Sequence, residues 1–547
     1  MTQNNIGWNF QNSYLKLADI MVSKLPPVPV KNPKVVLYND QLEQELGLNF
    51  SSLDEQEKAS YLSGNTIPEQ TTPWAEAYAG HQFGHLTMLG DGRAVVLGEH
   101  IAPNKKRFDI QFKGSGVTPY SRSGDGRAAL GPMLREYIIS EAIHFLNIPT
   151  SRSLAVVTTG EDVVRETILP GAILTRVAAS HIRVGTFEFV AAQKDINTLQ
   201  ELIMYCIDRH YQELKGQKNP ALQLFRAVMN RHADLIVNYM RVGFIHGVLN
   251  TDNVAISGES IDYGPCAFMD SYDPKTKFSS IDQQGRYAYG NQPIIAKWNM
   301  ARFAETLIPL IDVDLNKAIE MLEEEVNEFS KIYINKSLEM MRNKLGIKGG
   351  VEEDSLLIKE VLTWMQNNKV DYTNTFVSIM NETFDQSVYQ DQAFQEWYKK
   401  LRIRKPNRET MRQNNPLVIP RNHQVEASLK LAHEGNFESM ASLLSVLRNP
   451  YSSSNNYIKK SKKIAEELSG TNENGVLWAN QFDNIANTES HIQTTSREIW
   501  TQTAGQVHGF VCAVGTGGTL AGISIGLKEK NKNIKIALSD PIGSSLY

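Results

Sequence analysis

The chain has 547 residues, which is too long for a small binding module and predicts several domains, or one two-lobed enzyme with an appendage. Apolar residues make up 41% and charged residues 21%, so disorder, collagen and coiled coil are excluded for the chain as a whole. Lys and Arg number 56 against 60 Asp and Glu, for a net charge of -4. Because this balance lacks the positive excess that neutralises phosphate backbones, we expect no nucleic-acid partner.

The cysteines and the N-terminal sequence bear on the cellular compartment. Cys206, Cys266 and Cys512 are too scattered for a disulfide framework or a thiolate zinc site. No apolar run approaches the roughly 18 residues that cross a bilayer, and the first residues lack the regions of a signal peptide. The first arginine is Arg93, unlike an Arg-rich presequence. We expect a cytosolic protein with no membrane partner, and the sequence does not indicate its oligomeric state.

The first clear pattern is a pair of strands around a glycine-containing turn. The segment LTML leads into Gly90–Arg93, and AVVLGEHI follows with β-branched and apolar residues. This order predicts a hairpin that reverses at Gly90–Arg93.

A third strand is predicted after a turn at Pro103–Lys106. In residues 108–113, apolar side chains alternate with Asp109, Gln111 and Lys113. Since alternate residues of a strand share a face, Lys113 is expected on the polar face at the end of this strand.

A helix and two more strands complete the first part of the chain. Residues 131–147 carry apolar side chains at helical spacing, with Glu136 off the apolar stripe. Leu154–Val157 and Ala172–Leu174 are predicted strands around a turn at Gly160–Asp162.

Helical patterns dominate the later chain, from about residue 199 to 239 and again from 299 to 447. A β-rich start followed by an α-rich continuation predicts an α+β fold with two lobes and a cleft between them. A Pro, Ser and Asn cluster at 450–456 and a basic run at 459–463 mark a boundary. The predicted divisions are a β-rich nucleotide-binding lobe at 1–185, a mainly helical lobe at 186–450, a linker at 451–463 and an α/β appendage at 464–547.

Several residues follow the order found in protein-kinase-like phosphoryl sites. Such sites combine a glycine turn over the phosphates, a strand lysine paired to a helix glutamate, and a late Asn and Asp that hold magnesium. The chain offers Gly90–Arg93, Lys113, Glu136, Asn253 and Asp262 in that order. Each piece alone is common in hairpins, solvated strands or turns, but their joint order favours a nucleotide site with Mg²⁺.

One departure from the kinase pattern concerns the catalytic base. In kinases an Asp precedes the metal-binding Asn by five positions, and that position here is Val248. Valine cannot accept a hydroxyl proton, so ordinary γ-phosphoryl transfer lacks its base. Asp252, directly before Asn253, is the nearest carboxylate.

Long motifs in this chain resemble the selenoprotein O family of pseudokinases. They include WAEAYAGHQFGHLTMLGDGRAVVLGE, DIQFKGSGVTPYSRSGDGRAALGPMLREYIISEA, ILTRVAASHIRVGTFEF, GFIHGVLNTDNVAISGESIDYGPCAFMD and NPLVIPRNH, and the similarity covers about residues 1 to 450. The resemblance implies a two-lobed protein-kinase-like fold. It also implies a protein adenylyltransferase that moves AMP from ATP to a Ser, Thr or Tyr hydroxyl of a protein and releases pyrophosphate.

The resemblance also assigns roles to single residues. In the family ATP is inverted relative to kinases, and bidentate guanidinium groups suit a pyrophosphate leaving group. The resemblance implies phosphate contacts for Lys113, Arg176 and Arg183, and nucleotide contacts for Gly90, Gly92, Arg93, Asp125 and Gly126. It further implies that Asp252 is the proton acceptor and that Asn253 and Asp262 bind Mg²⁺ or Mn²⁺. Glu136 and Asp262 are placed in the same nucleotide site, and the alternative for Arg176 and Arg183 is a surface salt-bridge pair.

Two further features are expected to be structural. Cys266 is interpreted as a small buried residue, so redox control of the kind known in some members of the family is not expected here. His81 and His85 lie four residues apart, but no third ligand is near them in the sequence, and Gly80 and Gly84 argue against a regular helix. We expect hydrogen bonding rather than metal binding from them.

The last segment, from about Val476, resembles part of cysteine synthase, a pyridoxal-phosphate enzyme. Gly515, Thr516, Gly517, Gly518 and Thr519 lie between a predicted strand and a helix, where backbone N–H groups can hold a phosphate. The lysine motif that would bind the cofactor covalently is missing, so functional pyridoxal phosphate is not expected. A gene fusion and an assembly artefact both remain open as origins of this segment.

Three functions therefore compete. The leading hypothesis is the ATP-dependent protein adenylyltransferase, whose partners are acceptor proteins. The second is a non-catalytic pseudokinase that binds nucleotide as a scaffold, although Asn253 and Asp262 are both present. A pyridoxal-phosphate lyase is disfavoured by the missing lysine motif.

Overall fold

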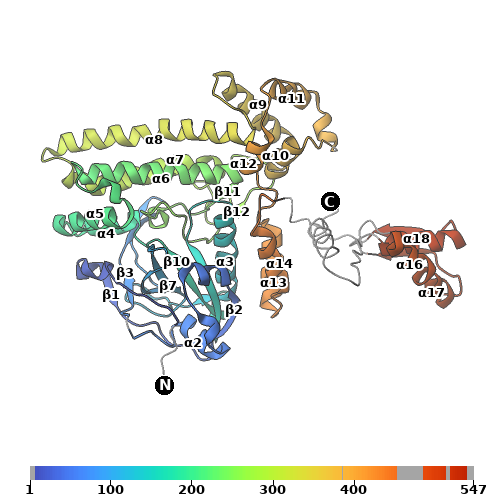
Figure 1. Cartoon of the computed structure of the whole chain (residues 1–547), viewed down its shortest axis with the longest axis horizontal. Helices are drawn as coiled ribbons and strands as arrows, with labels where there is room; N and C mark the ends of the chain where they lie inside the picture. Colours follow the sequence, from blue (N-terminus) through green and yellow to red (C-terminus); the bar gives the residue numbers. More distant parts are fainter. Residues whose placement is uncertain (1–5, 70, 385, 453–484, 513–517, 539–547) are drawn as a thin grey trace, which may run out of the picture. The chain divides into compact units, whose positions relative to one another are not determined.

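The computed structural model describes residues 6–69, 71–384, 386–452, 485–512 and 518–538 (Figure 1). It divides into two compact units, Met1–Tyr451 and Ser452–Tyr547. The mixed α and β composition expected from the sequence is confirmed, whereas the predicted limits of the two lobes and the linker stay predictions.

An eight-stranded sheet organises the first unit. Its order is β1-β3-β6-β7-β10-β9-β2, with β8 beside β10, and its strands pair antiparallel. The strands are β1 (Val22–Lys24), β2 (Lys34–Tyr38), β3 (Trp74–Glu76), β6 (Ala94–Ile101), β7 (Arg107–Lys113), β8 (Ala128–Ala129), β9 (Arg152–Val164) and β10 (Ile168–Ala178). The expected hairpin of β6 and β7 is present.

The predicted hairpin turn at Gly90–Arg93 is wrong. The strand before it, β5 (His85–Met88), pairs with β4 (Ala79–Gln82), and the strand after it, β6, pairs with β3 and β7. A Cβ on Gly90 would lie 2.5 Å from the Tyr120 ring, so the segment passes closely under that residue instead of reversing. Its glycines serve this close approach.

The polar face of β7 is buried rather than solvated. Asp109, Gln111 and Lys113 are 2%, 0% and 7% exposed, although alternation alone placed them on a polar face. This face therefore supplies polar groups to the interior.

The turn expected at Gly160–Asp162 is also wrong, because β9 continues through it to Val164. The chain reverses at residues 165–167, where the Arg165 N–H donates to the carbonyl of Thr167 at 2.9 Å. Gly160 has a φ of 69°, which lets the strand change direction without ending.

Helix α3 (Leu130–Phe145) covers one part of the sheet and packs against β9 and β10. Figure 1 shows α13 (Asn422–His433) and α14 (Glu438–Leu447) beside it. The sides of α3 are therefore buried, and Glu136 is only 2% exposed despite lying off the apolar stripe.

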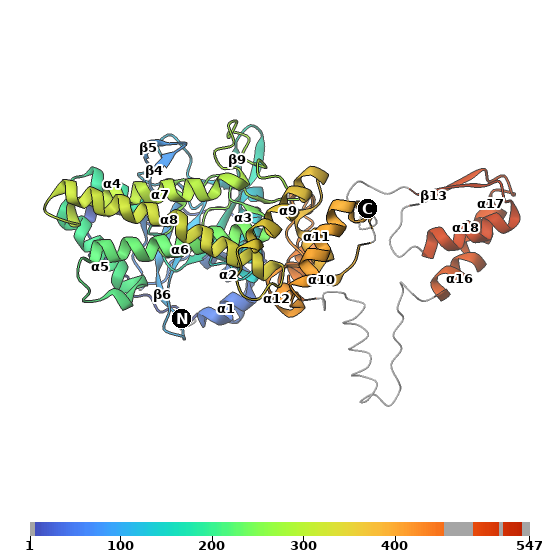
Figure 2. The ribbon, with the colours of Figure 1, turned by 90° about the horizontal axis from the view of Figure 1, so that it is seen from above.

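The helices that follow the sheet form a layered bundle, in which α6, α7 and α8 run alongside one another (Figure 2). Asn219 caps α6 by accepting from the Leu222 N–H, Pro220 opens it, and Gly243 ends it with a φ of 73°. The helices of the first unit are α1 (Asp40–Leu46), α2 (Glu55–Ser63), α4 (Val184–Ala192), α5 (Ile196–His210), α6 (Pro220–Val242), α7 (Gln292–Leu307), α8 (Leu315–Lys344), α9 (Glu353–Asn368), α10 (Tyr372–Asn381), α11 (Gln392–Ile403) and α12 (Arg408–Asn414), besides α3, α13 and α14.

A long loop leaves the bundle between two short paired strands, β11 (Phe244–Ile245) and β12 (Ala267–Phe268). The loop contains a single turn of 3₁₀ helix, η5 (Thr251–Asn253). Because its two ends are joined by strand pairing, the residues between them are held as one unit at the end of α6.

The second unit contains a β-α-β arrangement. Strands β13 (Gly509–Cys512) and β14 (Lys535–Leu538) pair in parallel, and α18 (Gly518–Lys530) lies between them in sequence, as the pattern predicted. Helices α16 (Ile485–Gln493) and α17 (Thr495–Gln502) pack on α18. Gly515, Thr516 and Gly517 lie outside the described residues.

No helix in the described part of the chain combines the length and the apolar character of a membrane span.

The hydrophobic core of the first unit predicts that this unit keeps its thermal stability when the second unit is removed. Its hydrophobic clusters are formed by residues up to Tyr451, and the second unit has its own small cluster of Val507, Ile523, Leu527 and Ile534. We expect a chain truncated before Ser461 to keep the unfolding temperature of the first unit in differential scanning calorimetry. A loss of stability above about 1 kcal/mol would contradict independent cores.

Candidate functional site

A cavity of about 310 Å³ is lined by the sheet, α3 and the loop between β11 and β12. Most of the site residues predicted from the sequence line it. They are Gly92, Arg93, Lys113, Glu136, Arg176, Arg183, Asp252, Asn253 and Asp262.

Lys113 ends β7 and lies between two carboxylates. Its Nζ is 2.6 Å from Oε2 of Glu136 on α3 and 2.6 Å from Oδ1 of Asp262 in the loop. The strand lysine and helix glutamate are thus paired, as the kinase-like order of residues predicted, and one ammonium group joins sheet, helix and loop.

Two buried arginines extend this cluster. Arg176 on β10 bonds Glu136 and Asp262, with its Nε 3.0 Å from Oε1 of Glu136. Arg183 donates from Nη1 to Oδ2 of Asp262 at 2.8 Å and to the backbone carbonyl of Asp252 at 2.8 Å. Both arginines are nearly inaccessible, at 1% and 3% exposure, so the surface salt-bridge alternative is wrong.

The cations dominate the electrostatics of the paired carboxylates. Burial alone raises the pKa of Asp262, but the charges of Arg176, Lys113 and Arg183 outweigh it and hold that pKa well below its usual value. Burial also opposes ionisation of Glu136, and Arg176 and Lys113 again lower its pKa. Both carboxyl groups are therefore ionised at neutral pH.

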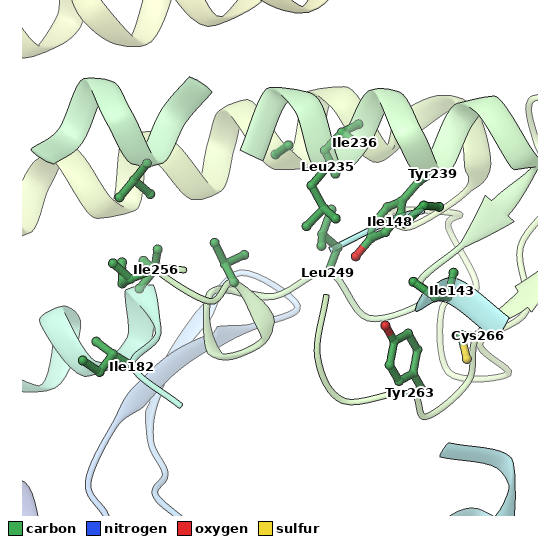
Figure 3. Close-up of a cluster of buried hydrophobic side chains, with 14 of the residues drawn as sticks. Ile143, Ile148, Ile182, Leu235, Ile236, Tyr239, Leu249, Ile256, Tyr263 and Cys266 are labelled. Carbon is green, nitrogen blue, oxygen red and sulfur yellow. The ribbon is translucent and has the colours of Figure 1, made fainter. Parts of the chain in front are cut away.

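The backbone around Asp262 is held in an unusual conformation. Asp262 has a φ of 65°, which is uncommon for a residue other than glycine. On one side, the His246 ring bonds the Ile261 carbonyl at 2.9 Å. On the other, the Tyr263 side chain lies among buried apolar groups including Ile143 and Tyr239 (Figure 3). The surrounding core thus over-determines the backbone that presents this carboxylate.

Asp252 differs from Asp262 in its surroundings. Burial raises the pKa of Asp252 to about 6, and the charge of Arg183 opposes this rise only in part. Val248 lines the same cavity and offers no titratable group. The carboxylate nearest to the position of a kinase base therefore gains a proton more readily than Asp262 does.

Asn253 is oriented for binding through oxygen. Its Nδ2 donates to the Val248 carbonyl at 2.8 Å, which leaves Oδ1 for a ligand. Together with the Asp262 carboxylate it offers hard oxygen donors, which fit Mg²⁺ or Mn²⁺ when phosphates complete the coordination. In the described part of the chain no three His, Cys, Asp or Glu side chains gather as a metal site.

Three lining residues escaped the sequence analysis. The Tyr78 ring lies 4.4 Å from the Arg183 guanidinium, and Asp91 accepts a hydrogen bond from Gln111 Nε2 at 3.2 Å. Gln111 also accepts from Arg176 Nη1 at 3.3 Å. Gln111 shares the face of Lys113 on β7, so alternation contained a signal for it. Tyr78 and Asp91 had no signal beyond proximity to the glycines.

Other predicted nucleotide contacts do not line the cavity. Gly90 is packed under Tyr120, and Gly126 is packed so closely against Gly116 that a Cβ would lie 2.1 Å from its carbonyl. The Asp125 carboxylate pairs with Arg165 at 2.8 Å and is partly exposed. Their roles toward nucleotide stay predictions.

One cysteine and two histidines were also singled out in the sequence. Cys266 is buried, and burial raises the pKa of its thiol to about 12, which suits a structural residue (Figure 3). His81 bonds Glu188, whereas His85 is exposed.

The site therefore combines three buried cations with carboxylate and amide oxygens around one cavity. Guanidinium and ammonium groups in this setting are typical of proteins that bind the phosphates of a nucleotide. Comparison with known proteins agrees with this class.

The family described as "Protein adenylyltransferase SelO" matches residues 5–489. A protein nucleotidyltransferase YdiU of Pelagibacter ubique is 54% identical over 455 residues, covering 82% of this chain and 94% of that protein. The proteins of the same name from Nitrosococcus oceani (54%; 84% and 95% covered) and Brevibacillus brevis (55%; 81% and 93% covered) are equally similar.

The chain belongs to the protein adenylyltransferase SelO family. The resemblance inferred from its motifs is confirmed, and so is the prediction of a nucleotidyltransferase enzyme. A second family, described as "Pyridoxal-phosphate dependent enzyme", matches residues 439–547, where the sequence resembled cysteine synthase.

The ion-pair cluster predicts the effect of substitutions. Lys113→Ala removes a cation beside the expected polyphosphate, and Asp262→Asn removes a proposed metal ligand. We expect each to lower the initial rate of nucleotidyl transfer about 10²- to 10³-fold, equivalent to about 3 to 4 kcal/mol.

Glu136→Gln is the graded control, because it acts only by misplacing Lys113 and Arg176 and should lower the rate less. Circular dichroism verifies folding of each variant. Near-wild-type turnover by folded Lys113→Ala or Asp262→Asn would contradict this site.

Proposed function

We propose that this protein transfers AMP from ATP to a Ser, Thr or Tyr hydroxyl of an acceptor protein and releases pyrophosphate. The family name and the relatives named protein nucleotidyltransferase support this reaction. The observation that carries it is the combination of three buried cations in the cavity with Val248 at the position of a kinase base.

The cations suit a leaving pyrophosphate. Lys113, Arg176 and Arg183 are preorganised by Glu136 and Asp262, so they need no rearrangement to receive negative charge. Placing the β- and γ-phosphates among them leaves the α-phosphorus for the attacking hydroxyl. Charge that develops on the departing pyrophosphate is then stabilised by these three buried cations.

Asp252 is the proposed proton acceptor. It lines the cavity, lies next to the proposed metal ligand Asn253, and has a carboxylate oxygen without a hydrogen-bond partner in the described structure. A proton would pass from the acceptor hydroxyl to this carboxylate as the oxygen bonds to the α-phosphorus. Arg183, which donates to the backbone carbonyl of Asp252, ties this residue to the phosphate-binding cluster.

Asn253 and Asp262 would hold Mg²⁺ or Mn²⁺ with the nucleotide. When bound, the ion neutralises phosphate charge and orients the phosphates. The residues of the chain supply the remaining functions of binding the polyphosphate, excluding water and accepting the proton.

The proposed architecture is a two-lobed protein-kinase-like fold. Its support is the antiparallel sheet with a lysine–glutamate pair, followed by a helical bundle whose loop brings Asn253 and Asp262 to the cavity. The alternative is a scaffold that binds nucleotide without transfer. No pyridoxal-phosphate activity is proposed for residues 439–547, because a lysine-linked cofactor site is not expected there.

The position of the transferred phosphorus tests the proposal. ATP labelled at the α-phosphorus should mark an acceptor protein such as casein, whereas ATP labelled at the γ-phosphorus should leave it unlabelled. Labelled protein is measured after gel electrophoresis, with Asp262→Asn as the matched inactive control. The opposite labelling would indicate a kinase, and tight ATP binding without either label would favour the scaffold.

A further inference from the structure

We propose that His81 and Glu188 are positioning residues that hold the loop of Asp252 through the hydroxyl of Thr251. The inference deepens the proposed function and rests on Asp252 as the proton acceptor. The residues come from β4, α4 and η5, which are far apart in sequence.

The contacts form a closed ring of hydrogen bonds. Thr251 donates from Oγ1 to Oε2 of Glu188 at 2.7 Å and accepts from the His81 backbone N–H at 2.8 Å. The His81 Nδ1 donates to the other oxygen of Glu188, Oε1, at 2.6 Å. Glu188 and Thr251 are 5% and 0% exposed, so water does not compete for these bonds.

Further packing fixes the histidine itself. The His81 ring lies edge-on to Trp298 with their centroids 5.3 Å apart. The side chain is thus held between an aromatic ring and a carboxylate, and its backbone N–H is aimed at Thr251. These contacts give His81 a positioning role and not the role of a metal ligand paired with His85, which is exposed.

Asp252 depends on its neighbours because one oxygen of its carboxylate has no hydrogen-bond partner in the described structure. Its Oδ1 is buried and has no hydrogen-bond partner among the described residues. No hydrogen bond from the described part of the chain fixes the side chain at this buried oxygen. Its location is therefore set by the backbone of η5, which the hydroxyl of the preceding Thr251 ties to β4 and α4.

Two glycines allow β4, α4 and η5 to pack closely against one another. A Cβ on Gly80 of β4 would lie 2.5 Å from Oδ1 and 2.7 Å from Cβ of Asp252. A Cβ on Gly185 of α4 would lie 2.0 Å from the carbonyl oxygen of Ala79. Strand, helix and loop therefore meet in contact beside Asp252, and the hydrogen-bonded ring fixes their mutual position.

A matched pair of variants tests the hydroxyl. Thr251→Val preserves the shape but removes the hydroxyl, and Thr251→Ser keeps it. We expect Thr251→Val to lower kcat for AMP transfer to casein about 10- to 100-fold, because a small displacement of a catalytic group is costly. The KM for ATP should rise less than kcat falls, since the side chains of Lys113, Arg176 and Arg183 keep their bonds to Glu136 and Asp262. Thr251→Ser should restore most of kcat.

A double-mutant cycle separates positioning from general stability. Glu188→Gln, which keeps the side-chain size, should lower kcat in the wild-type background but add no loss in an Asp252→Asn background. This cycle tests the inference even where Thr251→Val fails to fold, with thermal unfolding recorded for each variant.

Each outcome decides one of the two proposals. Equal kcat for Thr251→Val and Thr251→Ser, or an additive loss in the Asp252→Asn background, would overturn the positioning role. A folded Asp252→Asn variant with wild-type kcat would instead overturn Asp252 as the base, and the inference with it. Loss confined to the KM for ATP would assign the network to nucleotide binding and also overturn the inference.

Discussion

The structure depends on one buried group of charges. Lys113, Arg176 and Arg183 meet Glu136 and Asp262 with little access to water. The strands, the helix and the loop that bear these side chains must therefore bring them within hydrogen-bonding distance of one another. Glu136 and Asp262 pair directly with these cations, so none of the three positive charges is isolated in the interior. The guanidinium and ammonium groups that line the cavity can bind an anion there.

This group explains why sheet, helix and loop are arranged as they are. Lys113 ends β7, Arg176 lies on the neighbouring β10, and Glu136 reaches them from α3. Asp262 comes from a loop pinned at both ends by β11 and β12, and its left-handed φ is supported by Tyr263 in the hydrophobic core. Apolar packing around Tyr263 thus stabilises a backbone conformation of Asp262 that is unfavourable by itself.

Much of this arrangement was readable in the sequence. Alternation on β7 and helical spacing on α3 placed Lys113 and Glu136 away from the apolar faces, because both patterns follow from local backbone geometry. The kinase-like order of residues then predicted that the two side chains pair. The turn at Gly90–Arg93 was misread, since glycines that allow Tyr120 to pack closely look the same in sequence as glycines that reverse a hairpin. Burial of Glu136 escaped prediction because Arg176, and the helices α13 and α14 that pack beside α3, are distant from it in the chain. For the same reason neither the bond of Glu188 to His81 nor the free oxygen of Asp252 had a local signal.

Two aspartates in one cavity are given opposite properties by what surrounds them. Burial raises the pKa of both, but three cations reverse the effect at Asp262 and hold its pKa far below the ordinary value. At Asp252 burial prevails, Arg183 offsets it only in part, and the pKa rises to about 6. A carboxylate that stays ionised suits the binding of cations, and one that takes up a proton more readily suits proton transfer. All three cations lower the pKa of Asp262, whereas Arg183 is the one among them that lowers the pKa of Asp252. The division of roles between the two aspartates therefore follows from where Lys113, Arg176 and Arg183 are placed.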